Sequence, residues 1–211
     1  MIPSKEEFER VLIERHTKPV HERLKNASIA IAGAGGLGSN IAISLARAGV
    51  GRLFIVDFDK VEMSNLNRQQ YFIRHLGMYK TEAITEILHE INPYISVDYK
   101  TVQVTEDNAA GLFSGFDIIC EAFDRAESKA MLINTVLEKL PRTTIISGSG
   151  MAGYLSSNSI KTRKITDRLY ICGDGVTDSA DVNGLMAPRV AVCSNHQANM
   201  VIRLLLGYTD C

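Results

Sequence analysis

Short apolar runs alternate with helical apolar stripes along most of the 211-residue chain. The runs are bounded by glycine or polar residues, as buried parallel strands are, and they lie at residues 29–32, 53–56, 116–122 and 143–147. Apolar positions at helical spacing fall between them, at residues 39–48, 83–91, 107–113 and 126–140. This alternation predicts an α/β fold with a doubly wound, Rossmann-like, mainly parallel sheet.

The first residues depart from this alternation. Residues 1–26 are predicted to form an N-terminal helical segment of two short helices. Ser4 and Glu7 have the spacing of a capping box at the start of the first helix. We expect one domain overall, in which residues 27–211 build the sheet.

The last third of the chain follows a different pattern. Residues 154–162 and 168–172 are predicted to add antiparallel strands at one edge of the sheet. Residues 173–187 are rich in glycine and aspartate without an apolar period, so a mobile loop is expected there. A final helix over residues 190–206 would end at Gly207.

Composition narrows the class of protein. The net charge of -1 gives no electrostatic reason to expect a nucleic acid or an anionic membrane as a partner. No apolar run reaches membrane-spanning length, and the charged N-terminus lacks the apolar core of a signal peptide, so we expect a cytoplasmic protein. The scattered cysteines form no CxxC pair, which predicts reduced thiols and no structural zinc: Cys120, Cys172, Cys193 and Cys211.

A glycine turn follows the first apolar run. Its GxGxxG glycines are Gly33, Gly35, Gly36 and Gly38. Glycine lets the backbone turn sharply and approach a ligand, and the helix that follows offers amide N–H groups to a phosphate. Asp57 ends the next apolar run, about twenty residues on, where a dinucleotide fold has its ribose-binding carboxylate. The alternative, a packing turn with incidental glycines, leaves this acid unexplained.

Polar residues follow the predicted strands at the same edge of the sheet as the glycine turn. They are Asp59, Asn65, Asn67, Arg68, Gln69, Lys80 and Asp124. Arg68 and Lys80 are cations suited to a triphosphate, and Asp124 could hold Mg²⁺ together with phosphate oxygens. This set suits ATP better than NAD, although singly each cation could be a surface charge and Asp124 a helix cap.

Several segments together resemble the ThiF, MoeB and HesA family of ubiquitin-activating-enzyme-like adenylyltransferases. They read GAGGLGS, DFD, SNLNRQ, the GxxK ending in Lys80, and GLMAPRV. The resemblance runs from about Arg15 to Gly207. Within the family the chain looks most like the short bacterial ThiF group, which activates the sulfur carrier ThiS in thiamine biosynthesis.

The resemblance implies a reaction and a set of roles. The C-terminal Gly-Gly carboxylate of a small ubiquitin-fold sulfur carrier would attack the α-phosphorus of Mg·ATP, giving an acyl-adenylate and diphosphate. Gly36 would approach the phosphates and Asp57 the ribose. Asn67, Arg68, Gln69 and Lys80 would contact the triphosphate, and Asp124 would ligate Mg²⁺. The resemblance also implies a homodimer in which Arg15 reaches the partner's ATP site.

Two departures from the larger relatives limit what the resemblance implies. The chain lacks their two zinc-binding CxxC pairs, and residues 178–183 lack the cysteine that passes sulfur or a thioester. Adenylation alone is therefore the chemistry that is supported. The alternatives are a molybdopterin-carrier adenylyltransferase, a tRNA threonylcarbamoyladenosine dehydratase, and an NAD(P)-binding oxidoreductase or non-catalytic nucleotide sensor.

Overall fold

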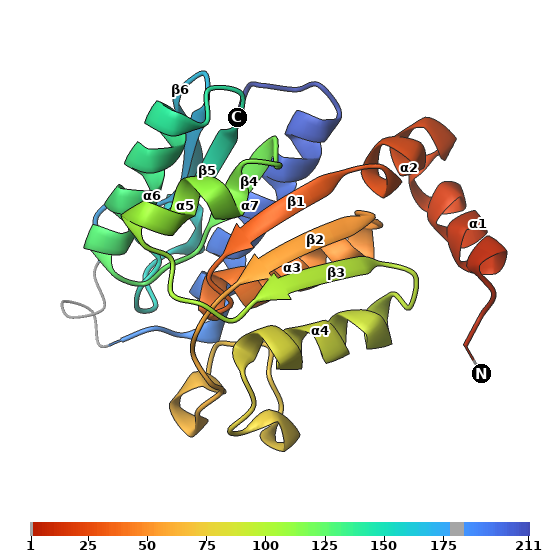
Figure 1. The fold of residues 1–211 in the computed structure, drawn as a ribbon, viewed down its shortest axis with the longest axis horizontal. Helices are drawn as coiled ribbons and strands as arrows, with labels where there is room; N and C mark the ends of the chain where they lie inside the picture. Colours follow the sequence, from red (N-terminus) through yellow and green to blue (C-terminus); the bar gives the residue numbers. More distant parts are fainter. Residues whose placement is uncertain (1, 178–183) are drawn as a thin grey trace.

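The computed structural model describes residues 2–177 and 184–211, and its centre is a seven-stranded sheet (Figure 1). The strands lie in the order β3-β2-β1-β4-β5-β7-β6. Their bounds are β1 Ser28–Ala32, β2 Arg52–Val56, β3 Ser96–Lys100, β4 Ile118–Glu121, β5 Thr144–Gly148, β6 Lys161–Thr166 and β7 Leu169–Gly173. All neighbours pair in parallel except β6, which runs antiparallel to β7. The predicted Rossmann-like, mainly parallel sheet is confirmed.

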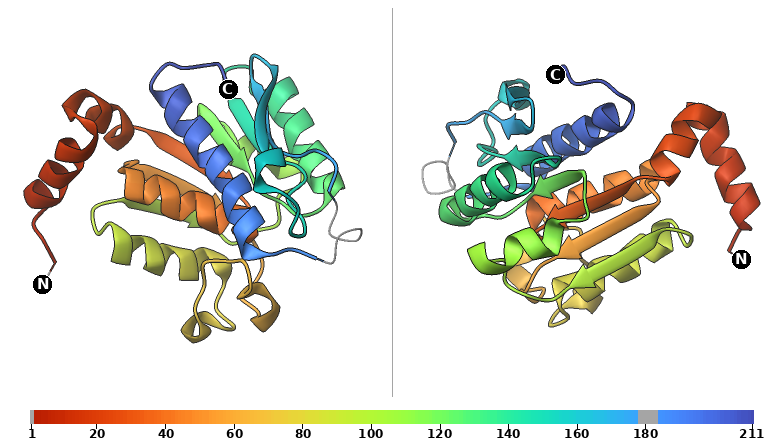
Figure 2. Two further views of the ribbon diagram at one scale, coloured as in Figure 1. Left: turned by 180° about the vertical axis from the view of Figure 1, so that it is seen from behind. Right: turned by 45° about the horizontal axis from the view of Figure 1, so that its top comes forward.

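Helices cover both faces of the sheet (Figure 2). One face carries α3 (Gly36–Ala48), α4 (Lys80–Ile91) and α7 (Ala187–Leu205), and the other carries α5 (Glu106–Phe113) and α6 (Ala126–Lys139). Three short 3-10 helices lie in the connections: Met63–Asn65, Ile73–His75 and Ser157–Ser159. Alternate residues of β1 enter the two cores, Ile31 on the α3 face and Ala30 on the α5 face. A strand buried on both faces explains its unbroken apolar run.

The N-terminal helices lie away from the body of the sheet (Figures 1 and 2). They are α1 (Lys5–His16) and α2 (Lys18–Lys25). The capping box holds, since the Glu7 amide donates to the Ser4 side chain and the Ser4 amide to the Glu7 side chain. No residue of α1 is buried. Thr17 joins the two helices with a φ of 73°, a left-handed conformation that is strained for a β-branched residue.

The strand predicted at residues 154–162 is wrong. Most of that stretch is irregular and includes a 3-10 helix, and the strand lies at Lys161–Thr166. The Ser156 side chain accepts a hydrogen bond from the Asn158 amide, a local bond that competes with pairing in a sheet. The expectation that β7 is also antiparallel to its sheet neighbours holds only toward β6, because β7 pairs with β5 in parallel.

The loop predicted at residues 173–187 is only partly described. Residues 178–183, whose sequence contains no cysteine, lie outside the described residues. Before them, Asp174 is held by several hydrogen bonds, and after them α7 begins at Ala187. Residues 174–177 and the start of α7 are thus held by local bonds, and the part of the predicted mobile loop at residues 178–183 stays a prediction.

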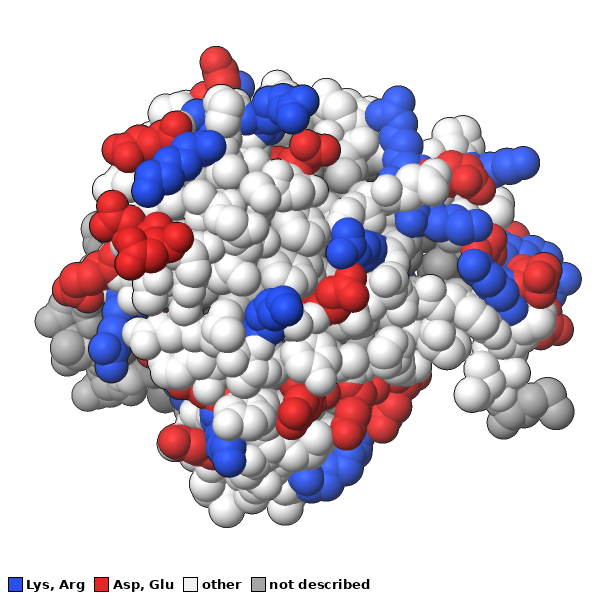
Figure 3. All heavy atoms as spheres, in the orientation of Figure 1, with Lys and Arg blue, Asp and Glu red and all other residues white. Residues whose placement is uncertain are grey.

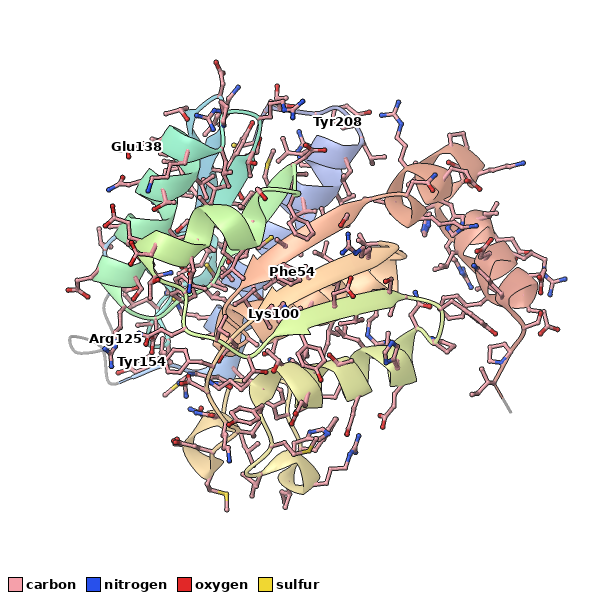
Figure 4. All side chains as sticks on the ribbon, viewed as in Figure 1. Phe54, Lys100, Arg125, Glu138, Tyr154 and Tyr208 are labelled. Carbon is pink, nitrogen blue, oxygen red and sulfur yellow. The ribbon has the colours of Figure 1, made fainter. Side chains whose placement is uncertain are left out.

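The strand register brings the predicted site residues to one edge. Ala32 pairs with both Val56 and Glu121, so the residues that follow these three strand ends emerge together. This edge is the switch point between β1 and β4, where open α/β sheets bind ligands. Figure 4 labels Arg125, which follows β4, and Tyr154, which follows β5, at this end of the sheet, whereas α1 lies at the opposite end.

Candidate functional site

Two glycines of the turn are required by the fold itself. Gly33 has a φ of 97°, and its amide donates to the Val56 carbonyl over 2.8 Å. A Cβ on Gly33 would lie 2.8 Å from the carbonyl oxygen of Ala122, and one on Gly38 would lie 1.8 Å from the carbonyl oxygen of Gly33. Neither position leaves room for a methyl group, so these glycines let α3 and the turn after β4 pack against β1.

The other two glycines face a more open space. A Cβ on Gly35 would meet only Nε2 of Gln69, at 3.8 Å, whereas one on Gly36 would lie 3.0 Å from Val190 and 3.5 Å from the Arg68 stem. The helix α3 begins at Gly36, three residues earlier than the sequence pattern predicts. Its first amides have no intrahelical partner, so they and the dipole of α3 are available to an anion above Gly35.

Gln69 lies beside this opening. The residue is 7% exposed, and among the described residues its side-chain Oε1 has no hydrogen-bond partner. A buried amide oxygen without a donor is unfavourable by roughly 1–3 kcal/mol. Gln69 is therefore a polar group at the glycine turn whose hydrogen bonding is incomplete within the described part of the chain.

Asp57 is a buried carboxylate that holds the glycine turn. One oxygen accepts the Ala34 amide at 2.6 Å and the other accepts the Asp59 amide at 2.8 Å. Burial raises the pKa of Asp57, and this outweighs the Lys80 charge and the two amides, which lower the pKa. A carboxylate has about four lone-pair sites, so both oxygens can still accept ribose hydroxyls.

Lys80 reaches the same edge from the first residue of α4. Its side chain is 8% exposed, and Nζ lies 2.7 Å from Oδ2 of the half-exposed Asp59. Asp59, predicted as a nucleotide contact, is thus the partner of the predicted phosphate cation. Within the chain the pair is neutral, and the lysine charge is held at this edge of the sheet by an acid that remains open to solvent.

The SNLNRQ motif forms a compact turn. The Asn65 side chain accepts the Glu62 amide, and its carbonyl accepts the amides of Arg68 and Gln69, so Asn65 shapes the loop. Asn67 donates to the Leu185 carbonyl at 3.0 Å and so ties the loop to the segment before α7.

The Arg68 guanidinium is held by neighbouring polar groups. It donates to the Ser64 carbonyl at 3.0 Å and to the Asn67 side chain at 2.8 Å, while its stem lies over Gly36. Hydrogen bonds to two neutral acceptors leave the positive charge uncompensated, so the cation stays suited to a phosphate.

Asp124 is exposed and lies three residues beyond the buried end of β4. It does not cap α6, whose N-cap is Arg125 and which has no side-chain cap. Among residues 2–177 and 184–211, no group of three or more His, Cys, Asp or Glu side chains could hold a metal ion. The donor set fits Mg²⁺ only as one carboxylate that completes a shell of phosphate and water oxygens.

Arg15 is not brought near the glycine turn within the chain. It is exposed in the last turn of α1, at the end of the sheet opposite the glycine turn (Figures 1 and 4).

Several residues that build the site had no signal in the sequence pattern. Tyr71 lies two residues after the SNLNRQ motif, is buried, and donates its hydroxyl to the Ala34 carbonyl at 2.7 Å. Burial raises the pKa of Tyr71 well above its ordinary value, so the hydroxyl stays protonated and donates. Tyr71 thereby fastens the glycine turn to the loop that carries Arg68.

A buried ion pair supports the start of α7. Arg189 Nη2 lies 2.6 Å from Oδ2 of Asp174, and the two side chains are only 4% and 5% exposed. Asp174 also accepts the amides of Val176 and Thr177. The pair fixes the first turn of α7, whose Val190 touches the glycine turn.

Three cysteines are core residues. Cys120, Cys172 and Cys193 are buried, and only Cys211 is exposed. Burial raises the pKa of Cys172 and of Cys193 to about 12, so neither thiol ionises near neutral pH. These two thiols are therefore unsuited to nucleophilic chemistry in this fold.

The chain matches proteins of one sequence family along nearly its full length. A sequence model described as the ThiF family matches residues 9–211. The adenylyltransferase and sulfurtransferase UBA4 of Scheffersomyces stipitis is 32% identical over 193 residues, which cover 88% of this chain and 43% of UBA4. The adenylyltransferase and sulfurtransferase MOCS3 of Aedes aegypti is 37% identical over 131 residues, which cover 61% of this chain and 29% of MOCS3. The chain thus spans less than half the length of these relatives.

Solved structures share the fold. The E. coli tRNA N6-threonylcarbamoyladenosine dehydratase TcdA, in complex with ATP, matches with a TM-score of 0.85 at 21% identity, over 98% of this chain and 97% of TcdA. E. coli MccB with AMPCPP and MccA matches with a TM-score of 0.69 at 26% identity, over 88% of this chain and 58% of MccB. Among the residues that the structure describes, no helix is both long and apolar enough to cross a membrane.

Proposed function

Because the chain belongs to the ThiF family, we propose that it is an ATP-dependent adenylyltransferase that joins AMP to the C-terminal glycine carboxylate of a small ubiquitin-fold carrier protein. One observation carries the proposal. The open glycine turn, the Arg68 guanidinium and the Lys80 ammonium all lie at the carboxyl edge of the sheet. Backbone amide N–H groups and two cations at one place suit the binding of a nucleoside triphosphate.

In this adenylation the attacking carboxylate is already ionised, so the protein does not need to activate the nucleophile. A carboxylate oxygen of the carrier attacks the α-phosphorus of ATP, the bond from that phosphorus to the bridging oxygen breaks, and diphosphate leaves with the electron pair. The barrier arises from bringing two anions together and from charge on the leaving diphosphate. Positioning and electrostatic stabilisation therefore do most of the work.

Each site residue has a role in this proposal. The first amides of α3 at Gly36 bind phosphate oxygens, and Asp57 accepts the ribose hydroxyls. Arg68 and Lys80 offset the negative charge of the triphosphate, with Asp59 holding Lys80 in place until the phosphates arrive. The Gln69 side-chain Nε2, which faces the space over Gly35, donates to a phosphate oxygen bound there.

Magnesium fits this scheme through Asp124. When bound, Mg²⁺ would offset the negative charge of the phosphates. Asp124 is the residue that we propose holds it, because its carboxylate is exposed at the strand end beside the glycine turn.

Carrier-dependent exchange of labelled diphosphate into ATP tests the proposal. Arg68→Ala and Asp124→Ala are each expected to lower the exchange rate by about a hundredfold or more, since each removes charge stabilisation of the transition state. Arg52→Ala is the matched control, because Arg52 pairs with Asp98 on the surface of β2 and β3. Exchange at the wild-type rate by both site variants, with the fold intact by circular dichroism, would show the site assignment to be wrong.

For the acceptor we propose a ThiS-like sulfur carrier ending in Gly-Gly, in thiamine biosynthesis, as the short bacterial ThiF-like motifs suggest. A second candidate is a modified tRNA nucleoside, because the TcdA fold matches over 97% of its length. On the face shown in Figure 3, acidic and basic side chains are interspersed over α1 and α2, which favours the protein carrier. AMP release measured with a Gly-Gly carrier or with tRNA decides between them.

We also propose a homodimer in which Arg15 acts on the partner's site. Arg15→Ala and Arg68→Ala would each be inactive alone. Mixed and re-equilibrated in equal amounts, they would regain about a quarter of the wild-type sites, because half of the dimers would hold one complete site. No recovery, with dimers present by light scattering, would show that Arg15 does not act in this way.

A further inference from the structure

A fully buried carboxylate ends β4, next to the glycine turn that follows β1. The Glu121 side chain is 0% exposed, and Nζ of Lys129 lies 3.2 and 3.1 Å from its two oxygens. The Phe123 amide donates to one of these oxygens at 2.7 Å, and the Ser147 hydroxyl donates to the other. Each carboxylate oxygen thus has two donors, which is what a buried charge requires.

These bonds join four elements at one point. Glu121 belongs to β4, Lys129 to the first turns of α6, and Ser147 to the end of β5. From α7, the Gln197 side chain donates to the Glu121 carbonyl at 3.0 Å. The network therefore fixes where β4 ends relative to the helix that follows it.

The short turn after Glu121 is confined from the other side by the glycine turn. The Ala122 amide donates to the Ala32 carbonyl at 2.8 Å, and the Ala122 carbonyl lies against Gly33. Phe123 is held by Glu121. Asp124 comes next and is exposed, and among the described residues its side chain has no hydrogen-bond partner. The turn therefore fixes the backbone of Asp124 before any ligand binds, but not its side chain.

We propose that Glu121 and Lys129 are positioning residues for the Asp124 carboxylate, and this rests on the proposed function. Their ion pair sets the turn that carries Asp124, so that the carboxylate meets a metal–nucleotide complex without reordering of the backbone. An apolar pair could fill the same space, and buried ion pairs often add little stability over such a pair. Unlike an apolar pair, the ion pair orients its neighbours: Glu121 accepts the Phe123 amide, and Lys129 ties α6 to the end of β4.

The test compares Glu121→Gln, Lys129→Met and Lys129→Arg with Val136→Ala, a cavity variant in the buried part of the same helix. Mn²⁺ serves as the metal probe, and its binding with a non-hydrolysable ATP analogue is followed by electron paramagnetic resonance at a temperature at which all variants are folded. Glu121→Gln and Lys129→Met are expected to weaken Mn²⁺ binding about tenfold, as expected for a lost charge-assisted hydrogen bond. The affinity for the nucleotide without metal should change less than about twofold, because these substitutions leave the residues that contact the nucleotide unchanged.

The control variants separate positioning from stability. Lys129→Arg should retain most of the wild-type Mn²⁺ affinity, because the arginine keeps the positive charge. Val136→Ala should lower the melting temperature without changing that affinity. If Glu121→Gln and Lys129→Met destabilise the fold but bind Mn²⁺ as the wild type does, the positioning role is overturned. It is also overturned if the wild-type complex binds no Mn²⁺.

Failure of the proposed function has a different signature. In that case the wild type binds the metal–nucleotide complex but does not exchange diphosphate with any Gly-Gly carrier. The Mn²⁺ series would still report on Glu121 and Lys129, because it needs no turnover.

Discussion

Nζ of Lys80 lies 2.7 Å from Oδ2 of Asp59, and the two side chains differ greatly in their exposure to solvent. Lys80 is 8% exposed and Asp59 is 49% exposed. The lysine charge also lowers the pKa of the buried Asp57, which burial raises. A buried ammonium held by an exposed acid keeps its orientation while leaving the acid free to yield to phosphate oxygens.

Lys80→Met tests this arrangement. We expect nucleotide affinity to fall by about ten- to a hundredfold, because a charge-assisted hydrogen bond contributes roughly 1.5–3 kcal/mol. Isothermal titration with ATP measures it. The control is Lys60→Met. The Lys60 ammonium lies nearby on the surface, 5.0 Å from the centroid of the Tyr79 ring. An equal loss of ATP affinity in both variants would mean that the overall positive charge near the site, and not the position of Lys80, sets the affinity.

Gly38→Ala should destabilise the fold by about 3 kcal/mol or more, since its methyl would overlap the Gly33 carbonyl and backbone would have to move. Gly111→Ala in α5 is the control, because its Cβ has no atom within 4 Å. That variant should gain about 0.5–1 kcal/mol from helix propensity. Urea unfolding of both variants measures the difference, and a tolerated Gly38→Ala would contradict the close packing of α3 on the glycine turn.

Gly35→Ala should have a different effect from Gly38→Ala. Its methyl would meet only Gln69, at 3.8 Å, so the free energy of unfolding should change by less than about 1 kcal/mol. The same methyl would occupy space over the turn where phosphates are proposed to bind, and ATP affinity should drop at least about tenfold. A stable variant that binds ATP normally would mean that the nucleotide lies elsewhere.

Arg189→Met should be costly because it leaves Asp174 buried without its partner. The expected loss is about 3–5 kcal/mol, as for other broken buried ion pairs. The double variant with Asp174→Asn should recover part of this loss, and a double-mutant cycle in urea measures the coupling. Purely additive losses would contradict a direct interaction.

The same pair has a pH signature. Burial raises the pKa of Asp174, but the amides of Thr177 and Val176, the Thr177 hydroxyl and Arg189 outweigh it, so the net pKa is lowered. Stability from this group is therefore present above its ordinary pKa and is lost as the pH falls through the folded value. The double variant should lose less stability than the wild type in that acid range.

His75 should make the fold weaker in mild acid. Its Nδ1 accepts the Phe72 amide at 3.0 Å, and burial, together with the Arg74 charge, lowers its pKa from 6.5. The unfolded chain then takes up a proton near pH 6.5 while the folded chain does not, so stability falls as the pH drops below about 6.5.

Unfolding free energies of wild type and His75→Asn between pH 7.5 and about 5 test this, because the asparagine keeps an acceptor and does not titrate. The slope should be smaller in the variant. His16 has the same sign of shift, from burial, so some slope should remain. Parallel curves would show that His75 is protonated as easily in the folded state as in the unfolded state.

The sequence pattern predicted the order of elements well because each central strand is buried on both faces. Runs such as residues 29–32 are then continuously apolar and bounded by glycine. The glycine turn, Asp57 and Lys80 were predicted at one edge because parallel strands share their carboxyl ends, and in the register the ends of β1, β2 and β4 lie side by side.

What could not be predicted depends on contacts across the fold. Glu121 and Lys129 are eight residues apart on different elements, and Asp174 and Arg189 are fifteen apart, so no local period links either pair. The strand before β7 was predicted too early because the serines of that segment can bond locally or pair in a sheet, and only the neighbouring strand decides between the two.

The strained joint at Thr17 has a consequence for how the molecule can rearrange. Because α1 buries none of its own residues, few contacts besides this residue orient the N-terminal helices, among them the Phe8 ring against Tyr94 and the Tyr94 hydroxyl on the Pro3 carbonyl. A β-branched residue held there stores roughly 1–3 kcal/mol of backbone strain. Relief of that strain would favour a change of backbone conformation at Thr17 if another surface offered α1 a place to pack.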